Sequence, residues 1–204
     1  MRRVTGPLRI ERYRGAAVRP WLSAVAPLRI AVFRDWPYLY EGELAYEADY
    51  LAAYAASPRS VFVLAFDGDR VIGAATGIPL VDDGAAFQQP FRERGLDPAT
   101  VFYFGESVLL PDYRGLGIGH AFFDHREAHA RELGGYTHTA FAAVDRADTD
   151  PRRPAGHRGH EVFWSKRGYQ RQPGMTMHLS WREVGAAAES SQPLTFWLRA
   201  LDPV

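Results

Sequence analysis

The chain has 204 residues, of which 24 are Lys or Arg and 24 are Asp or Glu, so its formal net charge is zero. This balance argues against nucleic acid as a partner, because nucleic-acid-binding domains usually carry a basic surface. The chain has no cysteine, which excludes disulfides, thiolate metal sites and a cysteine acyl-enzyme. We find no signal peptide and no apolar run of transmembrane length, and we expect one cytoplasmic domain over residues 1–204 that does not contact a membrane.

The first third of the chain predicts a strand followed by two helices. Residues 8–13 alternate apolar and charged side chains, which is the period of a half-exposed strand. Residues 21–33 and 43–55 carry apolar side chains at helical spacing and define a helical segment over residues 21–57. An aromatic turn that contains Trp36, Tyr38 and Tyr40 separates the two helices.

The middle of the chain predicts a hairpin and then a strand, a loop and a helix. Residues 60–66 and 71–78 are strands joined by Asp67-Gly68-Asp69, a strong hairpin signal. After a mixed stretch with a short helix near residues 85–94, the apolar and aromatic residues 102–110 predict one buried strand. A glycine-spaced loop and a helix to Leu133 follow.

The last third predicts strands at residues 136–144 and 175–181, with a short helix at 161–167 between them. Residues 185–204 read as a C-terminal tail, in which a small-residue linker precedes the apolar patch Phe196-Trp197-Leu198. The order of these elements predicts an α+β fold with a mixed sheet.

The loop from Arg114 to Gly119 has the composition of an anion site. Its glycines let backbone N–H groups approach a ligand, and the first turn of the following helix offers unpaired N–H groups with a partial positive charge. Together they suit a phosphate, and Arg114 adds a fixed positive fork. A P-loop is excluded because the only lysine is Lys166, and the glycine spacing disfavours a dinucleotide fingerprint.

This segment resembles the acetyl-CoA-binding segment of the GCN5-related N-acetyltransferase (GNAT) superfamily, in which Arg/Gln-x-x-Gly-x-Gly/Ala follows a strand. The resemblance covers about residues 60–182 and includes Phe163 to Tyr169 as the closing helix end and turn. It implies a mostly antiparallel central sheet with a splayed parallel strand pair and flanking helices. It also implies acetyl-CoA as co-substrate, no metal, and cofactor contacts from Val108, Leu109, Leu110, Arg114, Gly115, Leu116, Gly117, Ile118, Gly119 and His120.

Glu106 is the candidate general base for the acceptor amine. A carboxylate in an otherwise apolar strand is either paired or functional, and burial would raise its pKa toward neutrality. The alternative is a structural ion pair, for instance with Arg126. Many relatives place an acidic tyrosine on the closing helix; Trp164 stands there in this chain and cannot donate that proton, so another group does so or no acid is needed.

The acceptor side is less specific in the sequence. Tyr38, Tyr40 and Asp145 are candidate substrate-binding residues, each with ordinary packing or turn formation as the alternative. His125 and His129 have metal-ligand spacing, but we expect a solvated helix face there. The resemblance implies an N-acetyltransferase that acts directly on a small-molecule amine. The alternatives are a peptide or protein amine and a non-catalytic acyl-CoA sensing module, and the apolar tail suggests a homodimer contact.

Overall fold

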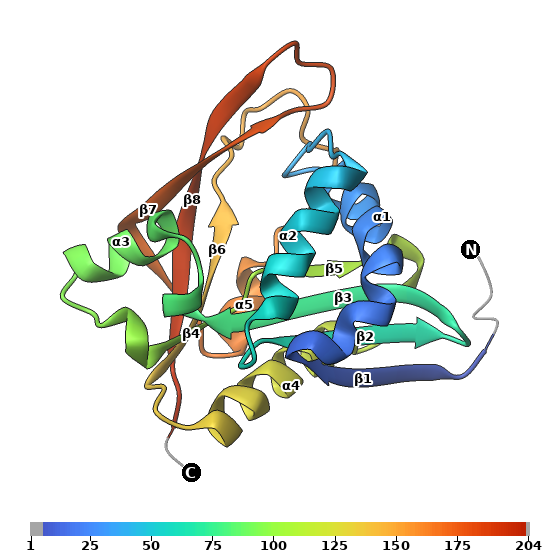
Figure 1. Ribbon diagram of the computed structural model, residues 1–204. Coiled ribbons are helices and arrows are strands. Elements are labelled where there is room, and N and C mark those ends of the chain that lie inside the picture. Colours follow the sequence, from blue (N-terminus) through green and yellow to red (C-terminus); the bar gives the residue numbers. More distant parts are fainter. Residues whose placement is uncertain (1–5, 203–204) are drawn as a thin grey trace.

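The strands form one mixed sheet, shown in a computed structural model in Figure 1. The structure describes residues 6–202. The sheet has eight strands in the order β1-β2-β3-β4-β6-β8-β7, and β5 pairs with β3 beside that path. The strands are β1 (Leu8–Arg14), β2 (Val61–Asp67), β3 (Arg70–Pro79), β4 (Val101–Tyr103), β5 (Ser107–Leu109), β6 (His138–Val144), β7 (Gln170–Arg182) and β8 (Glu189–Ala200).

Helices cover both faces of this sheet (Figure 1). The α-helices are α1 (Leu22–Phe33), α2 (Leu44–Ala56), α3 (Ala85–Glu93), α4 (Ile118–Leu133) and α5 (Glu161–Lys166). Strand β2 is buried along its whole length because it has a core on each side: Phe62 and Leu64 belong to the core shared with α1 and α2, whereas Val61 and Val63 face the core of α4. Side chains that alternate between two cores explain why β2 reads as a continuous apolar run.

The predicted sheet type is confirmed. Every pairing between the named strands is antiparallel except that of β4 with β6, which is parallel from Val101↔His138 to Tyr103↔Ala140. The predicted hairpin is also present, with Gly68 at a φ of 60° in the turn between β2 and β3.

The prediction of one continuous strand over residues 102–110 is wrong. Two residues, Gly105 and Glu106, lie opposite the single residue Thr76, so the ladder with β3 slips by one position between β4 and β5. This is a β-bulge, which bends the strand and redirects its side chains. Gly105 is needed there, because a Cβ on it would lie 2.7 Å from both Thr76 Oγ1 and the Tyr54 hydroxyl.

The prediction of a C-terminal tail is also wrong. Residues 189–200 form β8, which lies inside the sheet between β6 and β7. Phe196, Trp197 and Leu198 are buried in this strand, so they offer no exposed patch for a dimer contact. The polar start of β8 hid the strand, and its partners β6 and β7 are set by long-range register rather than by a local signal.

The helical stretch from Gly15 to Phe33 is long and apolar enough to cross a membrane by length and composition alone, so the sequence does contain such a run. Its apolar residues Val18, Val25 and Leu28 are buried in the core, and Arg29 in the same stretch forms buried ion pairs. The packing of this helix on the sheet accounts for these apolar residues.

Candidate active site

A free strand edge begins at the β-bulge. The parallel pairing of β4 with β6 ends where the Phe104 N–H donates to Ala140 O at 2.8 Å. Beyond that point β5 pairs with β3 and, among the described strands, with no other. One edge of β5 is therefore left without a strand partner on the side of β6.

The direction of the β5 peptide groups follows from two hydrogen bonds to β3. Thr76 N–H donates to Glu106 O at 3.1 Å, and Leu110 N–H donates to Ile72 O at 3.0 Å. Because peptide groups alternate along an antiparallel ladder, Val108 also faces β3, whereas the N–H groups of Ser107 and Leu109 point toward the free edge. Of the predicted cofactor contacts Val108, Leu109 and Leu110, only Leu109 therefore presents its N–H group there.

The glycine loop is open. Gly115 and Gly117 have φ values of 80° and 82°, and a Cβ on either would meet nothing within 4 Å. Leu116 between them is 51% exposed. Gly117 caps α4 without a side-chain hydrogen bond, and the first helical bond runs from Ala121 N–H to Gly117 O.

The first turn of α4 therefore keeps its N–H groups unpaired. The residues that carry them are Ile118, Gly119 and His120. Together with the positive end of the helix dipole, these donors form the arrangement that binds phosphate groups.

Cationic side chains surround this loop. Arg114 is exposed and its Nε donates to Leu109 O at 3.3 Å, so it links the loop to the free edge of β5. The Arg167 guanidinium lies 3.3 Å from Nδ1 of His120. Burial, together with the charge of Arg114, lowers the pKa of His160 below its usual value. Arg167 also pairs with Asp124 and Glu127, whereas Arg114 forms no ion pair within residues 6–202, so Arg114 is the cation that remains available to an anionic ligand.

Glu106 lies in the bulge and is 7% exposed. Its Oε2 pairs with Arg29 Nη1 at 2.5 Å and accepts a hydrogen bond from the Tyr50 hydroxyl at 3.1 Å. Its Oε1 is buried and has no hydrogen-bond partner within residues 6–202. The carboxylate is thus paired, but with Arg29 rather than Arg126, which donates instead to the backbone oxygen of Glu106. A role as base stays a prediction.

Arg29 joins two buried carboxylates. It pairs with Glu106 from the bulge and with Glu47 from α2, and both Arg29 and Glu47 are buried. Burial alone would lower the pKa of Arg29, but the carboxylate of Glu106, the Tyr50 hydroxyl and the carboxylate of Glu47 raise it above its ordinary value. Arg29 therefore stays charged and offsets one of the two negative charges.

Tyrosines and one further carboxylate surround this group. The rings of Tyr50 and Tyr54 lie 4.9 Å apart, and the Tyr54 hydroxyl donates to Asp83 Oδ2 at 2.7 Å. Burial raises the pKa of Tyr38 to about 12, with a further contribution from the charge of Glu106. Sequence reasoning missed Arg29, Tyr50 and Asp83; the helical spacing of Glu47, Tyr50 and Tyr54 on one face of α2 was the signal that could have found part of the cluster.

The other two predicted acceptor residues have partners of their own. Burial and a hydrogen bond with Glu47 raise the pKa of Tyr40. Asp145 accepts hydrogen bonds from Arg171 at 2.8 Å and from Thr195 Oγ1 at 2.5 Å, so its carboxylate is held against β7 and β8. Neither arrangement tests substrate binding, and both assignments stay predictions.

Three further predicted residues can be placed. Trp164 packs on Phe141 and Trp197, with ring centroids 5.0 and 5.1 Å apart. Tyr169 is buried, and its hydroxyl contacts Thr139 and Glu127. The expectation of a solvated face is wrong for His129, which is buried. No group of three metal-ligating side chains occurs in the part of the chain that the structure describes.

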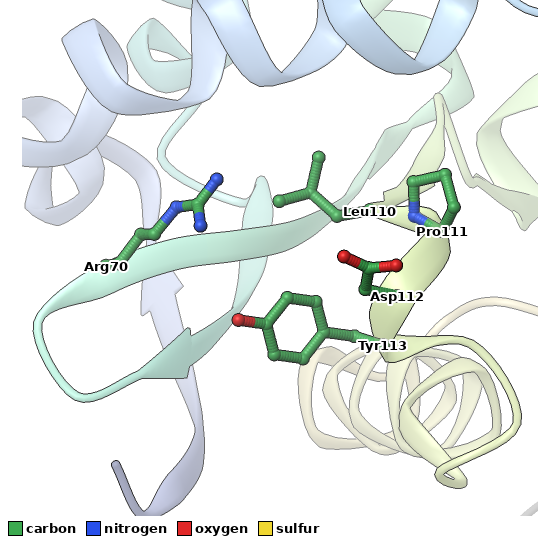
Figure 2. A pocket seen from close by; sticks show the side chains of 5 residues that line it. All are labelled: Arg70, Leu110, Pro111, Asp112 and Tyr113. Carbon is green, nitrogen blue, oxygen red and sulfur yellow. The ribbon is translucent and has the colours of Figure 1, made fainter. Parts of the chain in front are cut away.

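A surface hollow lies beside the loop rather than at Glu106. It is lined by Arg70 from the start of β3 and by Leu110, Pro111, Asp112 and Tyr113 from the turn before the loop (Figure 2). The Tyr113 hydroxyl donates to Asp67 Oδ2 at 2.7 Å and fixes this turn to the β2–β3 hairpin. The hollow shares only Leu110 with the predicted site.

Comparisons with known proteins agree with this arrangement. The model of the acetyltransferase (GNAT) family matches residues 28–153, and no curated protein is significantly similar in sequence. A GNAT-family acetyltransferase from Staphylococcus aureus has a TM-score of 0.60 at 13% identity, covering 96% of this chain and 100% of that one. The structure of yncA from Salmonella typhimurium, solved with acetyl-CoA, has a TM-score of 0.59 at 12% identity, covering 96% of this chain and 94% of that one. An acetyltransferase from Thermus thermophilus has a TM-score of 0.57 at 14% identity, covering 97% of this chain and 99% of that one. At these identities the likeness shows the fold.

Proposed function

This chain belongs to the GNAT acetyltransferase family, and on that premise we propose that it is an acetyl-CoA-dependent N-acetyltransferase. The acceptor is the primary amine of a small molecule, and transfer is direct within a ternary complex. One observation carries the proposal: an open glycine loop with unpaired helix N–H groups directly follows a strand whose edge is free.

The chain's own residues suggest how acetyl-CoA is held. The diphosphate is bound by the N–H groups between Arg114 and His120, with the Arg114 guanidinium at the entrance. The pantetheine arm lies along β5 like an added strand and bonds to the N–H group of Leu109, which leaves the N–H group of Ser107 for the thioester. Ser107 joins the predicted contacts because its peptide group, unlike that of Val108, points to the free edge.

The chemistry then needs a proton acceptor and a polarised thioester. The amine nitrogen forms a bond to the carbonyl carbon while the carbon–sulfur bond breaks and a thiolate leaves. Glu106 takes the proton of the amine through Oε1, the oxygen without a partner among the described residues. Backbone N–H groups of β5 stabilise the oxyanion. Trp164 supplies no proton, and a thiolate is a tolerable leaving group without one.

A second function is favoured by one observation. The charge of Glu106 is offset by Arg29, and Trp164 replaces the usual acidic tyrosine. Both features suit a non-catalytic module that binds acyl-CoA and senses it. The two functions differ in turnover rather than in binding, so one assay separates them.

The test is acetyl-CoA turnover across a panel of small amines and lysine peptides, read as thiol release. The protein has no thiol of its own, so the background is low. We expect turnover with a small amine, and a loss of about 10²-fold or more in Glu106→Gln. The matched control is Glu132→Gln, an exposed carboxylate on α4.

Each outcome has a distinct meaning. Turnover on lysine peptides alone would indicate that the acceptor is a peptide or protein amine rather than a small molecule. Binding of acetyl-CoA without turnover on any amine would favour the sensing module. Absence of acetyl-CoA binding would refute both. The cytoplasmic location and a homodimer stay predictions, the latter without the contact first suggested for it.

A further inference from the structure

Arg126 is the largest fully buried side chain among residues 6–202, at 1% exposure, and it lies in the middle of α4 beneath the β-bulge. Its Nε donates to Phe122 O of its own helix at 3.1 Å. Its other donors reach the sheet: Nη1 donates to Thr76 O at 3.1 Å and to Glu106 O at 3.0 Å, and Nη2 donates to Ser107 Oγ at 2.8 Å.

Within residues 6–202 this arginine forms no ion pair, although the charges of Glu106 and Glu127 act on it from a greater distance. No carboxylate lies within ion-pair distance of it in residues 6–202; its guanidinium instead lies over the rings of Phe104 and Phe123, at 4.1 and 4.9 Å. Burial lowers the pKa of Arg126 to about 10, which still leaves it charged at neutral pH. Burying an unpaired charge is costly, and here the charge is directed at the peptide groups of the bulge.

The peptide group between Glu106 and Ser107 receives this charge. Its carbonyl oxygen accepts from both Arg126 Nη1 and Thr76 N–H. In a trans peptide the N–H points opposite to the C=O, so Ser107 N–H points away from β3 and toward the free edge. Hydrogen bonds to a carbonyl polarise the whole amide and strengthen the donor at its other end. A hydrogen bond from a charged guanidinium polarises the amide more than one from a neutral N–H group.

We propose that Arg126 is a positioning residue: it fixes the bulge and, through the Glu106–Ser107 peptide, makes Ser107 N–H the donor that polarises the thioester carbonyl. This inference rests on the proposed function. The bulge sets the direction of the N–H group, and the buried cation sets its strength. Arg126 itself contacts neither the cofactor nor the acceptor.

The experiment compares affinities for acetyl-CoA and for CoA, which lacks the carbonyl. In Arg126→Met we expect the affinity for acetyl-CoA to fall about 3–10-fold relative to the affinity for CoA. We also expect kcat to fall about 10-fold or more, which is less than the 10²–10³-fold loss seen when an oxyanion donor is removed altogether. The infrared stretch of a ¹³C-labelled thioester should move toward its value in water. Arg126→Lys keeps the positive charge but loses the planar guanidinium, and it takes the place of Arg126→Met if that neutral variant fails to fold.

Glu127→Gln is the control for a merely structural effect. Glu127 is buried on the same helix and binds Arg167, Tyr169 and Arg199 rather than the peptide groups of the bulge. It should lower the melting temperature without moving the affinity ratio or the infrared band. An unchanged ratio and band in both Arg126 variants would overturn the inference while leaving the enzyme assignment intact. If the unmodified protein binds neither compound, both proposals fail.

Discussion

Removing the arginine shared by two buried carboxylates should be among the most damaging single substitutions in this protein. Arg29→Met keeps a long side chain against Phe33 and Tyr50 but leaves Glu47 and Glu106 uncompensated. Breaking a buried ion pair costs about 3–5 kcal/mol. For a chain of this size, that cost corresponds to a fall in melting temperature of roughly 6–20 °C.

The measurement is urea unfolding followed by tryptophan fluorescence, using the five tryptophans of the chain. Arg34→Met is the matched control, because Arg34 pairs with Glu41 at the same 2.5 Å but is half exposed; its loss should be at most about 1 kcal/mol. Adding Glu47→Gln and Glu106→Gln to Arg29→Met should recover most of the lost stability. A cost below about 1 kcal/mol, or no recovery, would refute the view that Arg29 neutralises this cluster.

Three further substitutions test other parts of the structure. Gly117→Ala should weaken CoA binding about tenfold or more, because it adds a methyl group to the loop and strains a residue with left-handed backbone angles. The control Gly185→Ala, also at a φ near 80°, strains only the β7–β8 turn. Calorimetric titration would show equal CoA affinities for the two variants if the loop does not bind CoA. Gly105→Ala should destabilise the protein by about 1–3 kcal/mol, because the new Cβ would lie 2.7 Å from Thr76 Oγ1; unchanged unfolding would contradict the close packing of the bulge. His129→Gln should make the free energy of unfolding depend less on pH in the acid range. Burial holds the pKa of His129 in the folded protein below 6.5, so the unfolded chain takes up the extra proton first. The wild type therefore loses stability as the pH falls below that value. Denaturation at pH 7.5 and 5.5 checks this, with His125→Gln on the same helix as the reference variant.

The features predicted from sequence are those with a local cause. The Asp-Gly turn at Gly68 and the glycine loop before α4 need only a few neighbouring residues, and both formed where the sequence placed them. The helices α1 and α2 followed from apolar spacing within each segment. Such signals are short-range, so one sequence was enough to find them.

The features that were missed depend on residues far apart in the chain. The bulge at Gly105 needs Thr76 and Tyr54 as neighbours, which no local pattern announces. The pairing of Glu106 with Arg29 joins the bulge to α1 across much of the chain. Arg126, considered as an ion-pair partner of the Glu106 carboxylate, donates to the backbone oxygen of that residue instead. Side-chain partners of this kind are fixed by tertiary packing, which spacing alone does not contain.

The place of β8 has a consequence for how the molecule is made. This strand comes after both of its partners in the chain, yet it separates β6 from β7 and pairs with both. Until β8 has been synthesised, β7 lacks the one strand that pairs with it among the described residues, and the outer edge of β6 stays bare. A chain truncated before Glu189 would therefore expose two strand edges and should be an easy target for proteases.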